Sequence, residues 1–222
     1  MVLSPHPDDE SLGCGGTLKT ITGAGGVVDV IYMTSGENGV FPGIAPTPQQ
    51  CEDLKVKRQA EAREACRILG VRNVTFLPGK DGSLSAQPQL AEDILCALGA
   101  SDYRSVFCPW PFDGHPDHVA TYQLFHNALH RYVVELEVYL YEVWSPMPAN
   151  LVLSIDATFA SKLEAFSAHA SQAALLRYKE GFEGLARYRS LFCPPVSFAE
   201  AFYRTERSEL LANRDLPWSR WH

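Results

Sequence analysis

The sequence predicts an α/β fold, a three-layer sandwich in which an open, mostly parallel sheet carries helices on both faces. Short apolar runs rich in β-branched residues recur along the chain, and each is typical of a buried strand. Segments with apolar residues at helical spacing lie between these runs. Strand–helix alternation of this kind favours a parallel sheet, whose ligands bind beyond the carboxyl ends of the strands.

The amino-terminal third begins this alternation. The apolar run at 1–3 predicts a first strand, a glycine-rich helix is expected at 12–22, and the β-branched run at 27–33 predicts a second strand. The segment 47–69 has a clear helical pattern. We expect that helix to end at Gly70, because glycine readily adopts the left-handed conformation that stops a helix.

The alternation continues toward the carboxyl terminus. Further strands are expected at 74–77, 105–108, 136–144 and 151–155, with helices at 90–98 and 117–132. The remainder, beyond residue 155, is expected to be mostly helical. The longest irregular stretch, 36–48, follows the second strand, so we expect it to line a pocket at the carboxyl edge of the sheet.

Length and composition narrow the class of protein. At 222 residues, 46% hydrophobic and 20% charged, the chain is expected to form a single domain over 1–222. Its formal charge of −7 and the lack of basic clusters argue against nucleic acid or an anionic membrane as a partner. No apolar run approaches the roughly 20 residues that cross a bilayer, and the amino terminus has no signal-peptide pattern. Six scattered cysteines without a C-x-x-C pair predict reduced thiols and a cytoplasmic protein.

Two His/Asp clusters carry the chemistry of this sequence. The first, at 6–10, reads His-Pro-Asp-Asp-Glu and follows the first predicted strand directly. The second, at 115–118, reads His-Pro-Asp-His and follows the predicted strand at 105–108. Because the carboxyl ends of parallel strands meet at one edge of a sheet, we expect both clusters to share one site.

The residue types at these positions are those of a hydrolytic metal site. A catalytic zinc takes three protein ligands and keeps one position open for water. His6 and Asp9 supply two ligands from one turn, and His118 supplies the third from a distant strand end. A metal held in this way lowers the pKa of bound water to about 7 and polarises a carbonyl oxygen. Zinc fits the ligand set, and ferrous iron fits a set of two histidines and one carboxylate as well.

The remaining side chains of the clusters supply acid–base groups. Asp8, next to the ligand Asp9, is the natural general base for the attacking water. His115 would stabilise the tetrahedral oxyanion or protonate the departing amine, and Asp117 could orient its imidazole. Together these groups predict metal-assisted hydrolysis of an amide.

Three further patterns indicate packing and not chemistry. The spacing of His126 and His130 resembles a metal pair, but without the glutamate of an H-E-x-x-H arrangement we expect packed or solvated histidines. The glycines at 13, 15 and 16 fit neither a phosphate loop nor a dinucleotide fingerprint, so close backbone packing is expected there. Cys14 is expected to be a small buried residue.

The two clusters resemble the signatures of a known family. Residues 4–10 with 13–16, and residues 115–118, are similar to the two signatures of the LmbE-like, or PIG-L, de-N-acetylases. Weaker similarities occur at 33–37, 58–62, 81–82 and 169–172, so the resemblance runs from residue 3 to about residue 205. Members remove N-acetyl groups from glucosamine-containing molecules, including thiol-cofactor and glycosylphosphatidylinositol precursors, chitobiose and glycopeptide antibiotics.

The resemblance implies a Rossmann-like domain and a role for each matching residue. It implies zinc ligands at His6, Asp9 and His118, a base at Asp8, and an acid and oxyanion partner at His115 paired with Asp117. Substrate contacts are implied for the three further positions Arg58, Asp81 and His169. A homo-oligomer is also expected from the family.

One departure concerns the substrate. Mycothiol-type relatives have a tyrosine two residues before the second cluster, where this chain has Asp113, so a mycothiol-type substrate is not implied. The expected activity is removal of an N-acetyl group from an N-acetylglucosaminyl conjugate. Two alternatives stay open: a metal-dependent hydrolase of a non-sugar amide in a secondary metabolite, and a non-catalytic module that binds sugar or metal. Intact Asp8 and His115 argue against the last, because binding alone requires neither a base nor an acid.

Overall fold

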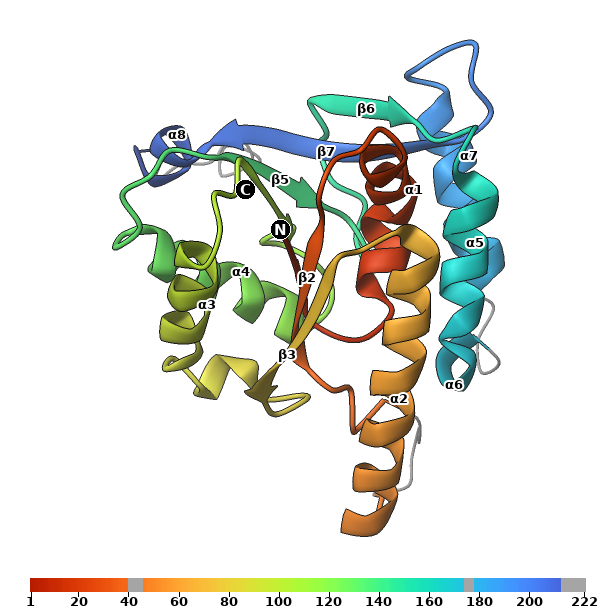
Figure 1. The fold of residues 1–222 in the computed structure, drawn as a ribbon. Helices are drawn as coiled ribbons and strands as arrows, with labels where there is room; N and C mark the ends of the chain where they lie inside the picture. The colour runs from red at the N-terminus through yellow and green to blue at the C-terminus, as the bar shows by residue number, and fades with distance from the viewer. Residues whose placement is uncertain (40–45, 174–177, 213–222) are drawn as a thin grey trace.

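A seven-stranded sheet forms the centre of the protein (Figure 1). The computed structural model describes residues 1–39, 46–173 and 178–212, and the strands follow the order β3-β2-β1-β4-β5-β7-β6. Their bounds are β1 Val2–Ser4, β2 Asp29–Thr34, β3 Asn73–Gly79, β4 Ser105–Pro109, β5 Glu137–Tyr141, β6 Leu151–Ser154 and β7 Ala199–Glu206. The pairs from β3 across to β5 are parallel, so the predicted α/β class and mostly parallel sheet are confirmed.

The described residues beyond 155 are mostly helical, as predicted, but they also include the strand β7, which the sequence pattern did not predict. This strand runs antiparallel between β5 and β6, and it pairs Phe202 with both Tyr141 and Leu151. Its alanines and glutamates are good helix formers, but residues 199–202 are all buried, and burial in the sheet overrides that weak local preference.

Helices cover both faces of the sheet. In Figure 1, α1 (Asp9–Gly23), α2 (Pro48–Leu69) and α5 (Phe159–Ala168) pack together on one side, and α3 (Leu90–Gly99) and α4 (Pro116–Leu129) on the other. The shorter elements are η1 Leu84–Ala86, α6 Ala170–Ala173, α7 Tyr178–Ser190 and α8 Arg207–Ala212. The predicted end of the long helix at Gly70 is confirmed by the φ of 79° at this residue.

The glycines of α1 allow close packing, as the sequence predicted. A Cβ on Gly13 would lie 2.3 Å from the ring of the buried Tyr141, and a Cβ on Gly16 would lie 2.7 Å from Ile155. Neither neighbour is the free end of a flexible side chain. The bare backbone of α1 therefore lies directly against the sheet, next to the first His/Asp cluster.

An ion pair contacts α1 in its middle. The Lys162 ammonium and the Glu200 carboxylate approach to 2.5 Å and both side chains are buried. The ammonium donates to the carbonyl of Leu12, and the carboxylate accepts the amide hydrogens of Gly16 and Thr17. In an undisturbed α-helix, the amide of Gly16 would donate its hydrogen to the carbonyl of Leu12. The pair thus ties α1 to α5 and β7 through its backbone.

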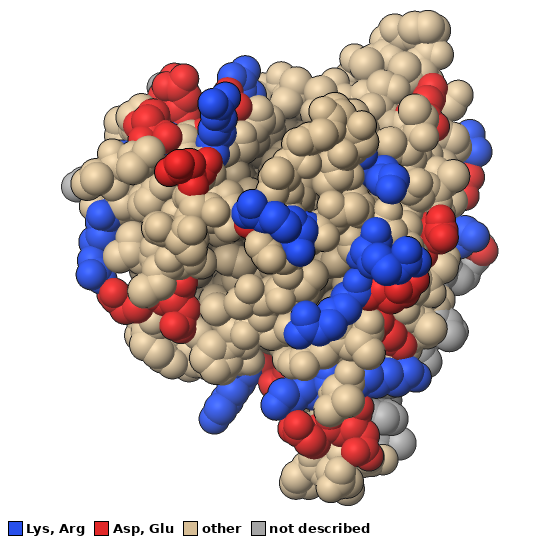
Figure 2. Space-filling view, in the orientation of Figure 1, with Lys and Arg blue, Asp and Glu red and all other residues tan. Residues whose placement is uncertain are grey.

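Surface and thiol properties complete the description. All six cysteines are free thiols. Within the described ranges, no helix is long and apolar enough to cross a membrane. On the face shown in Figure 2, basic side chains alternate with acidic ones. Residues 40–45 of the predicted pocket loop at 36–48 lie outside the described residues.

Candidate active site

The two His/Asp clusters meet because β1 and β4 are neighbours. The first cluster begins two residues after β1 ends at Ser4 and leads into α1. The second lies at the start of α4, where His115 is the residue that caps the helix, after β4 has ended at Pro109. Since β1 and β4 pair in parallel, both clusters lie at the same edge of the sheet, as the sequence predicted.

The three predicted metal ligands converge on one carboxylate oxygen. Asp9 Oδ2 lies 3.2 Å from Nδ1 of His6 and 3.2 Å from Nε2 of His118. All three side chains are buried, and in the described part of the chain neither ring nitrogen of His118 makes a well-aligned hydrogen bond, although carboxylate oxygens of Asp9 and Asp113 lie 3.2 Å and 3.3 Å away. A buried ring nitrogen needs a partner, and a cation held by the three residues would supply one for Nε2. The residues therefore fit a metal ion.

The charges of this group favour an anionic Asp9. Burial by itself raises the pKa of Asp9, but the imidazoles of His118 and His6 hold it far below its usual range. Burial lowers the pKa of His6, yet its hydrogen bonds to Asp117, Asp81 and Asp9 raise it well above the usual value. Two groups of three described residues have potential ligand atoms close together: His6, His115 and His118, and His6, Asp81 and Asp117. Neither group includes Asp9, which adjoins the first through its contacts with His6 and His118.

The second ring nitrogen of His6 is held by two carboxylates. Nε2 lies 3.2 Å from Asp117 Oδ2 and 3.2 Å from Asp81 Oδ1. The Asp117 carboxylate also accepts the amide hydrogens of Gly82 (2.6 Å) and Leu84 (3.0 Å). These contacts fix the direction of the His6 ring, which leaves Nδ1 to face Asp9.

This arrangement corrects the expected role of Asp117. Its carboxylate orients His6, whereas the sequence pattern predicted that it orients His115. Asp117 contacts His115 through the backbone instead, because its amide hydrogen is donated to His115 Nδ1 at 3.2 Å. The physical reason is local: His115 caps α4, so its Nδ1 turns toward the first free amide of the helix.

The backbone contact sets the tautomer of His115. Because Nδ1 accepts a hydrogen bond, a neutral ring carries its proton on Nε2. Burial, together with the neighbouring His6 and His118, lowers the pKa of His115. Its ring centre is 4.7 Å from that of His6 and 5.1 Å from that of His118. A neutral N–H donor therefore lies beside the candidate metal ligands.

Asp8 has the properties of a base poised near neutral pH. It is 7% exposed, and burial raises the pKa of its carboxyl to about 6, against the opposing effect of the Arg58 guanidinium. Arg58 Nη2 lies 3.4 Å from Asp8 Oδ1. The backbone of Asp8 is unusual, with φ of 134°, a region that L-residues rarely adopt.

The three predicted substrate contacts occupy different places. Arg58 is 3% exposed and donates to the carbonyls of Gly36 (3.0 Å) and Pro7 (2.5 Å). Asp81 uses one carboxylate oxygen for His6 and the other for the amide hydrogen of Asn38. Both lie around the predicted metal ligands, with their polar groups largely engaged by protein.

His169 lies behind the site. Its side chain is fully buried, and its Nε2 is 2.8 Å from Glu10 Oε1. A sugar would have to displace packed protein to reach it. The structure thus places His169 against the first cluster from inside the molecule, and not on a surface that a substrate contacts.

Asp113 has a role that the sequence pattern did not predict. Its Oδ1 lies 3.3 Å from His118 Nδ1 and accepts the amide hydrogen of His115. Its Oδ2 accepts the amide hydrogen of Trp144 from the loop after β5. Metal-binding histidines commonly have such a carboxylate on the second ring nitrogen. The signal for this role was an acidic residue just before the second cluster, at the position where some relatives have a tyrosine.

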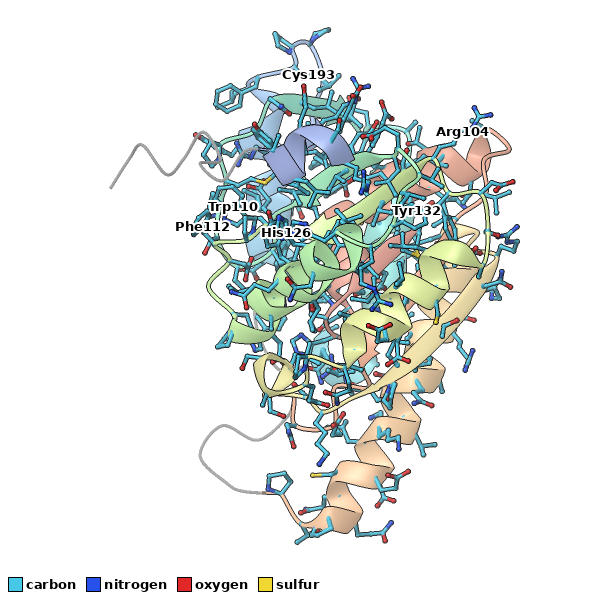
Figure 3. All side chains as sticks on the ribbon, turned by 90° about the vertical axis from the view of Figure 1, so that its left-hand side faces the viewer. Arg104, Trp110, Phe112, His126, Tyr132 and Cys193 are labelled. Atoms are coloured by element: carbon cyan, nitrogen blue, oxygen red, sulfur yellow. The ribbon has the colours of Figure 1, made fainter. Side chains whose placement is uncertain are left out.

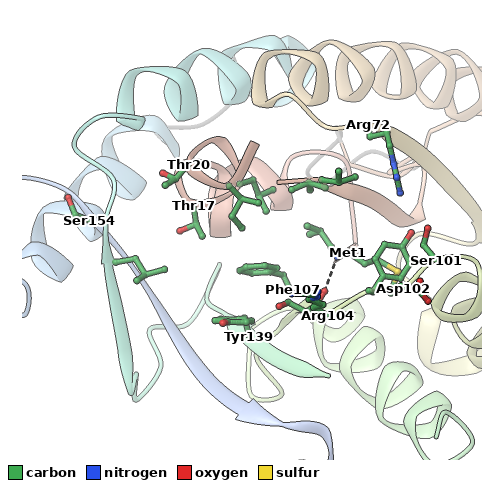
Figure 4. A pocket seen from close by; sticks show the side chains of 18 residues that line it. Met1, Thr17, Thr20, Arg72, Ser101, Asp102, Arg104, Phe107, Tyr139 and Ser154 are labelled. Atoms are coloured by element: carbon green, nitrogen blue, oxygen red, sulfur yellow. Dashed lines mark hydrogen bonds between the residues drawn. The ribbon is translucent and has the colours of Figure 1, made fainter. Parts of the chain in front are cut away.

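Features outside the site involve other residues. His126, labelled in Figure 3, lies on α4, and its ring contacts those of Tyr122 and His130. A cavity of about 780 Å³ opens at the amino ends of the strands, on the opposite edge of the sheet (Figure 4). No predicted site residue lines it, so it is separate from the His/Asp site.

The sequence matches a known protein family and several curated proteins. The family model PIG-L, described as GlcNAc-PI de-N-acetylase, matches residues 1–129. The diacetylchitobiose deacetylase of Thermococcus kodakarensis is 32% identical over 123 residues, which cover 53% of this chain and 44% of that protein. The "probable N-acetyl-alpha-D-glucosaminyl L-malate deacetylase 2" of Bacillus cereus is 28% identical over 182 residues, 78% of this chain and 82% of that protein.

A solved structure supports the fold. The N,N'-diacetylchitobiose deacetylase from Pyrococcus horikoshii superposes with a TM-score of 0.84 at 23% sequence identity. The match covers 100% of this chain and 87% of that chain. The sheet and its helices are therefore arranged as in a deacetylase of known structure.

Proposed function

Because the chain belongs to the PIG-L family of de-N-acetylases, we propose that it removes the N-acetyl group of an N-acetylglucosaminyl conjugate. The products are acetate and a free amine. The observation that carries this proposal is the convergence of His6 and His118 on Asp9, with Asp8 and His115 beside them. One reaction, hydrolysis of an amide, uses every one of these groups.

His6, Asp9 and His118 would hold a divalent metal, and zinc suits two imidazoles and a carboxylate. When bound, the metal polarises the amide carbonyl and lowers the pKa of a water molecule. The three residues contribute a net single negative charge, since Asp9 is anionic and the imidazoles bind metal in their neutral form. Asp81 and Asp117 support this arrangement by holding the other nitrogen of His6.

Asp8 is the better base of the two adjacent aspartates. Asp9 is engaged by two imidazoles, which hold its pKa far below neutral and make it a weak acceptor of protons. The pKa of Asp8 lies at about 6, so at pH 7 it is mostly ionised yet binds a proton readily. Asp8 therefore takes the proton from the water that attacks the acetamide carbon.

His115 supplies the complementary hydrogen-bond donor. Its Nδ1 is occupied by the Asp117 amide, so the N–H at Nε2 is free to stabilise the oxyanion as the carbonyl becomes tetrahedral. The nitrogen of the sugar leaves as an amine after it gains a proton, and Asp8, which then holds the proton taken from the water, can give it back.

An aromatic surface next to the site supports a ring-shaped substrate. Trp144 is 41% exposed, and its ring packs against those of Tyr178 (5.1 Å) and Phe182 (6.2 Å). The Trp144 Cβ lies close to Gly114, one residue before His115. Aromatic rings offer a flat apolar face to a pyranose.

The free cysteines support our proposal of a reducing, cytoplasmic location.

The test is amine release from a panel of N-acetylglucosaminyl compounds by zinc-loaded protein. The panel contains the free sugar, chitobiose, a malate glycoside, an inositol glycoside and a glycopeptide. We expect release from at least one member, and a loss of about 100-fold or more in kcat for Asp8→Ala at unchanged zinc content, because general base catalysis contributes that much.

Two results would contradict the proposal. Full turnover by Asp8→Ala removes the base assignment, and no release from any compound by zinc-loaded protein removes the amino-sugar substrate. His118→Ala tests the ligand set separately: we expect a lower zinc stoichiometry by elemental analysis, and an unchanged value excludes His118 as a ligand.

A further inference from the structure

The backbone of Asp8 is held in a strained conformation. Its φ of 134° makes it the only described non-glycine residue with positive φ. Such a conformation is unfavourable for an L-residue and persists only where surrounding contacts enforce it. The contacts that enforce it here identify residues on which the position of the proposed base depends.

Glu10 holds the amide side of Asp8. The amide hydrogen of Asp8 is donated to Glu10 Oε2 at 3.1 Å, and Glu10 is fully buried. On the other side, the carbonyl of Asp8 accepts the amide hydrogens of Ser11 and Leu12, each at 3.0 Å. The α1 helix fixes the carbonyl side, so the amide side depends on the Glu10 carboxylate.

His169 in turn holds Glu10. Glu10 Oε1 lies 2.8 Å from His169 Nε2 and accepts the hydroxyl of Ser11 at 2.6 Å. The imidazole comes from the junction of α5 and α6, 159 positions along the chain. Burial lowers the pKa of His169, but the facing carboxylate of Glu10 raises it, so Nε2 carries a proton toward Glu10.

A stabilising role alone does not account for this pair. Removing two charged groups from water costs about as much as their attraction returns, so a buried ion pair adds little to stability by itself. What the pair does provide is a fixed direction for the Glu10 side chain. That direction leaves Oε2 aimed at the amide of Asp8.

We propose that Glu10 and His169 are positioning residues, which hold the strained backbone of Asp8 so that its carboxylate faces the substrate. Neither residue touches the reacting atoms. The catalytic part of this proposal rests on the proposed deacetylase activity, whereas the effect on the backbone of Asp8 does not.

The first test is structural and independent of activity. Crystal structures of the wild-type protein and of Glu10→Ala are compared at Asp8. Without the carboxylate we expect the φ of Asp8 to become negative, because nothing then offsets the cost of the strained conformation. A positive φ retained in Glu10→Ala overturns the proposal.

The second test separates positioning from general destabilisation. For Glu10→Ala and His169→Phe we expect kcat to fall about 10- to 100-fold, because a displacement of about 1 Å in a catalytic group has effects of this size. KM and zinc content should stay within about twofold. Glu10→Gln keeps an acceptor oxygen for the Asp8 amide and should recover most of the kcat lost in Glu10→Ala.

Glu200→Gln is the matched control. It breaks another buried pair, between Glu200 of β7 and Lys162 of α5, that contacts α1 at Gly16 and Thr17, away from Asp8. We expect it to lower stability and leave kcat unchanged at a temperature where all variants are folded. Equal loss of kcat in Glu200→Gln and Glu10→Ala overturns the positioning role. If the wild-type protein hydrolyses no glycoside, the proposed function fails, and the φ comparison still decides the backbone claim.

Discussion

The carboxylate of Asp113 joins the second His/Asp cluster to the loop that follows β5. Its two oxygens serve the His118 ring, the amide of His115 and the amide of Trp144, and the side chain is fully buried. An amide side chain has only one acceptor oxygen. In such a variant, at least one of the three groups would face the NH₂ of the side chain instead of an oxygen. A backbone amide in that position could not form a hydrogen bond, because both groups are donors.

For Asp113→Asn we therefore expect zinc affinity to fall about 10- to 100-fold, the usual effect of altering the partner of a metal-binding histidine. A chelator competition titration measures it. The control is Asp102→Asn, the same chemical change at an exposed aspartate. Equal zinc affinity in both variants would show that Asp113 does not support the metal site.

At this scale the sequence predicted the residues that belong to contiguous motifs. His6, Asp8, Asp9, His115 and His118 were found because each cluster comes after a predicted strand, and the structure brings them together. The roles of Glu10 and Asp113 were missed, although Glu10 is the last residue of the first cluster and Asp113 lies two residues before the second. Their roles depend on partners over 25 positions away, His169 and Trp144, and spacing does not reveal which distant group a buried carboxylate will meet.

Among the elements, α1 depends on charged groups that other elements bring to it. Lys162 and Glu200 engage its backbone where the glycines allow close approach. Removing one partner of a buried pair leaves the other charge without compensation. The broken pair also leaves the amides of Gly16 and Thr17 with weaker acceptors.

We expect Glu200→Gln to lower the free energy of unfolding by about 3 kcal/mol, at the low end for a broken buried pair because glutamine keeps one acceptor oxygen. Urea unfolding measures the change. Glu183→Gln is the control, since its pair with Arg187 is on the surface and such pairs contribute about 0–1 kcal/mol. A loss in Glu200→Gln no larger than in the control would contradict the structural role of the pair.

Asp29 connects the amino ends of three strands. Its carboxylate accepts hydrogen bonds from Arg72 and Asn73 at the start of β3 and from Tyr103 before β4. Burial raises the pKa of Asp29, but these partners, Arg72 first, lower it below the usual value overall. A carboxyl whose folded-state pKa is lowered stabilises the fold above its unfolded pKa of about 4.

For Asp29→Asn we thus expect a loss of stability that is full at neutral pH. As the pH falls below about 4 and through the folded-state pKa, the difference from wild type should shrink, because the wild-type carboxyl then takes up a proton as well. Urea midpoints at pH 7 and pH 3 test this. A difference that is the same at both pH values would assign the effect to packing instead of charge.

The elements show where sequence patterns are reliable. Buried strands such as β2 were predicted because a short run of β-branched residues packs well in a sheet and poorly in a helix. The strand β7 was missed because its sequence, AEAFYRTE, has no strict alternation, and its buried Glu200 looked like a surface residue. That glutamate is buried only because Lys162 meets it, which is a property of the assembled fold.

In the whole molecule, we expect binding of the proposed zinc ion to be coupled to folding. The three proposed ligands come from β1–α1 and from the start of α4, which adjoin only in the native sheet. A ligand that binds only the folded state raises its stability by about 2.7 kcal/mol at one hundred times its Kd. We expect chelator-treated protein to have a lower Tm, restored by added zinc, when measured by scanning fluorimetry.

The same titration on His118→Ala provides the control, because this variant lacks one proposed ligand. Its Tm should respond to zinc weakly or not at all. A wild-type Tm that is insensitive to both chelator and zinc would argue against a metal site at these residues.

The strand order has a further consequence for how this protein could be divided. β1 lies between β2 and β4 in the sheet, and a cut before β4 separates the first 104 residues from the rest. The first part holds the proposed ligands His6 and Asp9, and the second part holds His118. Neither fragment alone can complete the site. Two separately expressed fragments, 1–104 and 105–222, would regain tight zinc binding only by reassembling the sheet across the β1–β4 boundary. The metal would then act as a reporter of fragment complementation, and its uptake would measure the joining of the two halves without any substrate.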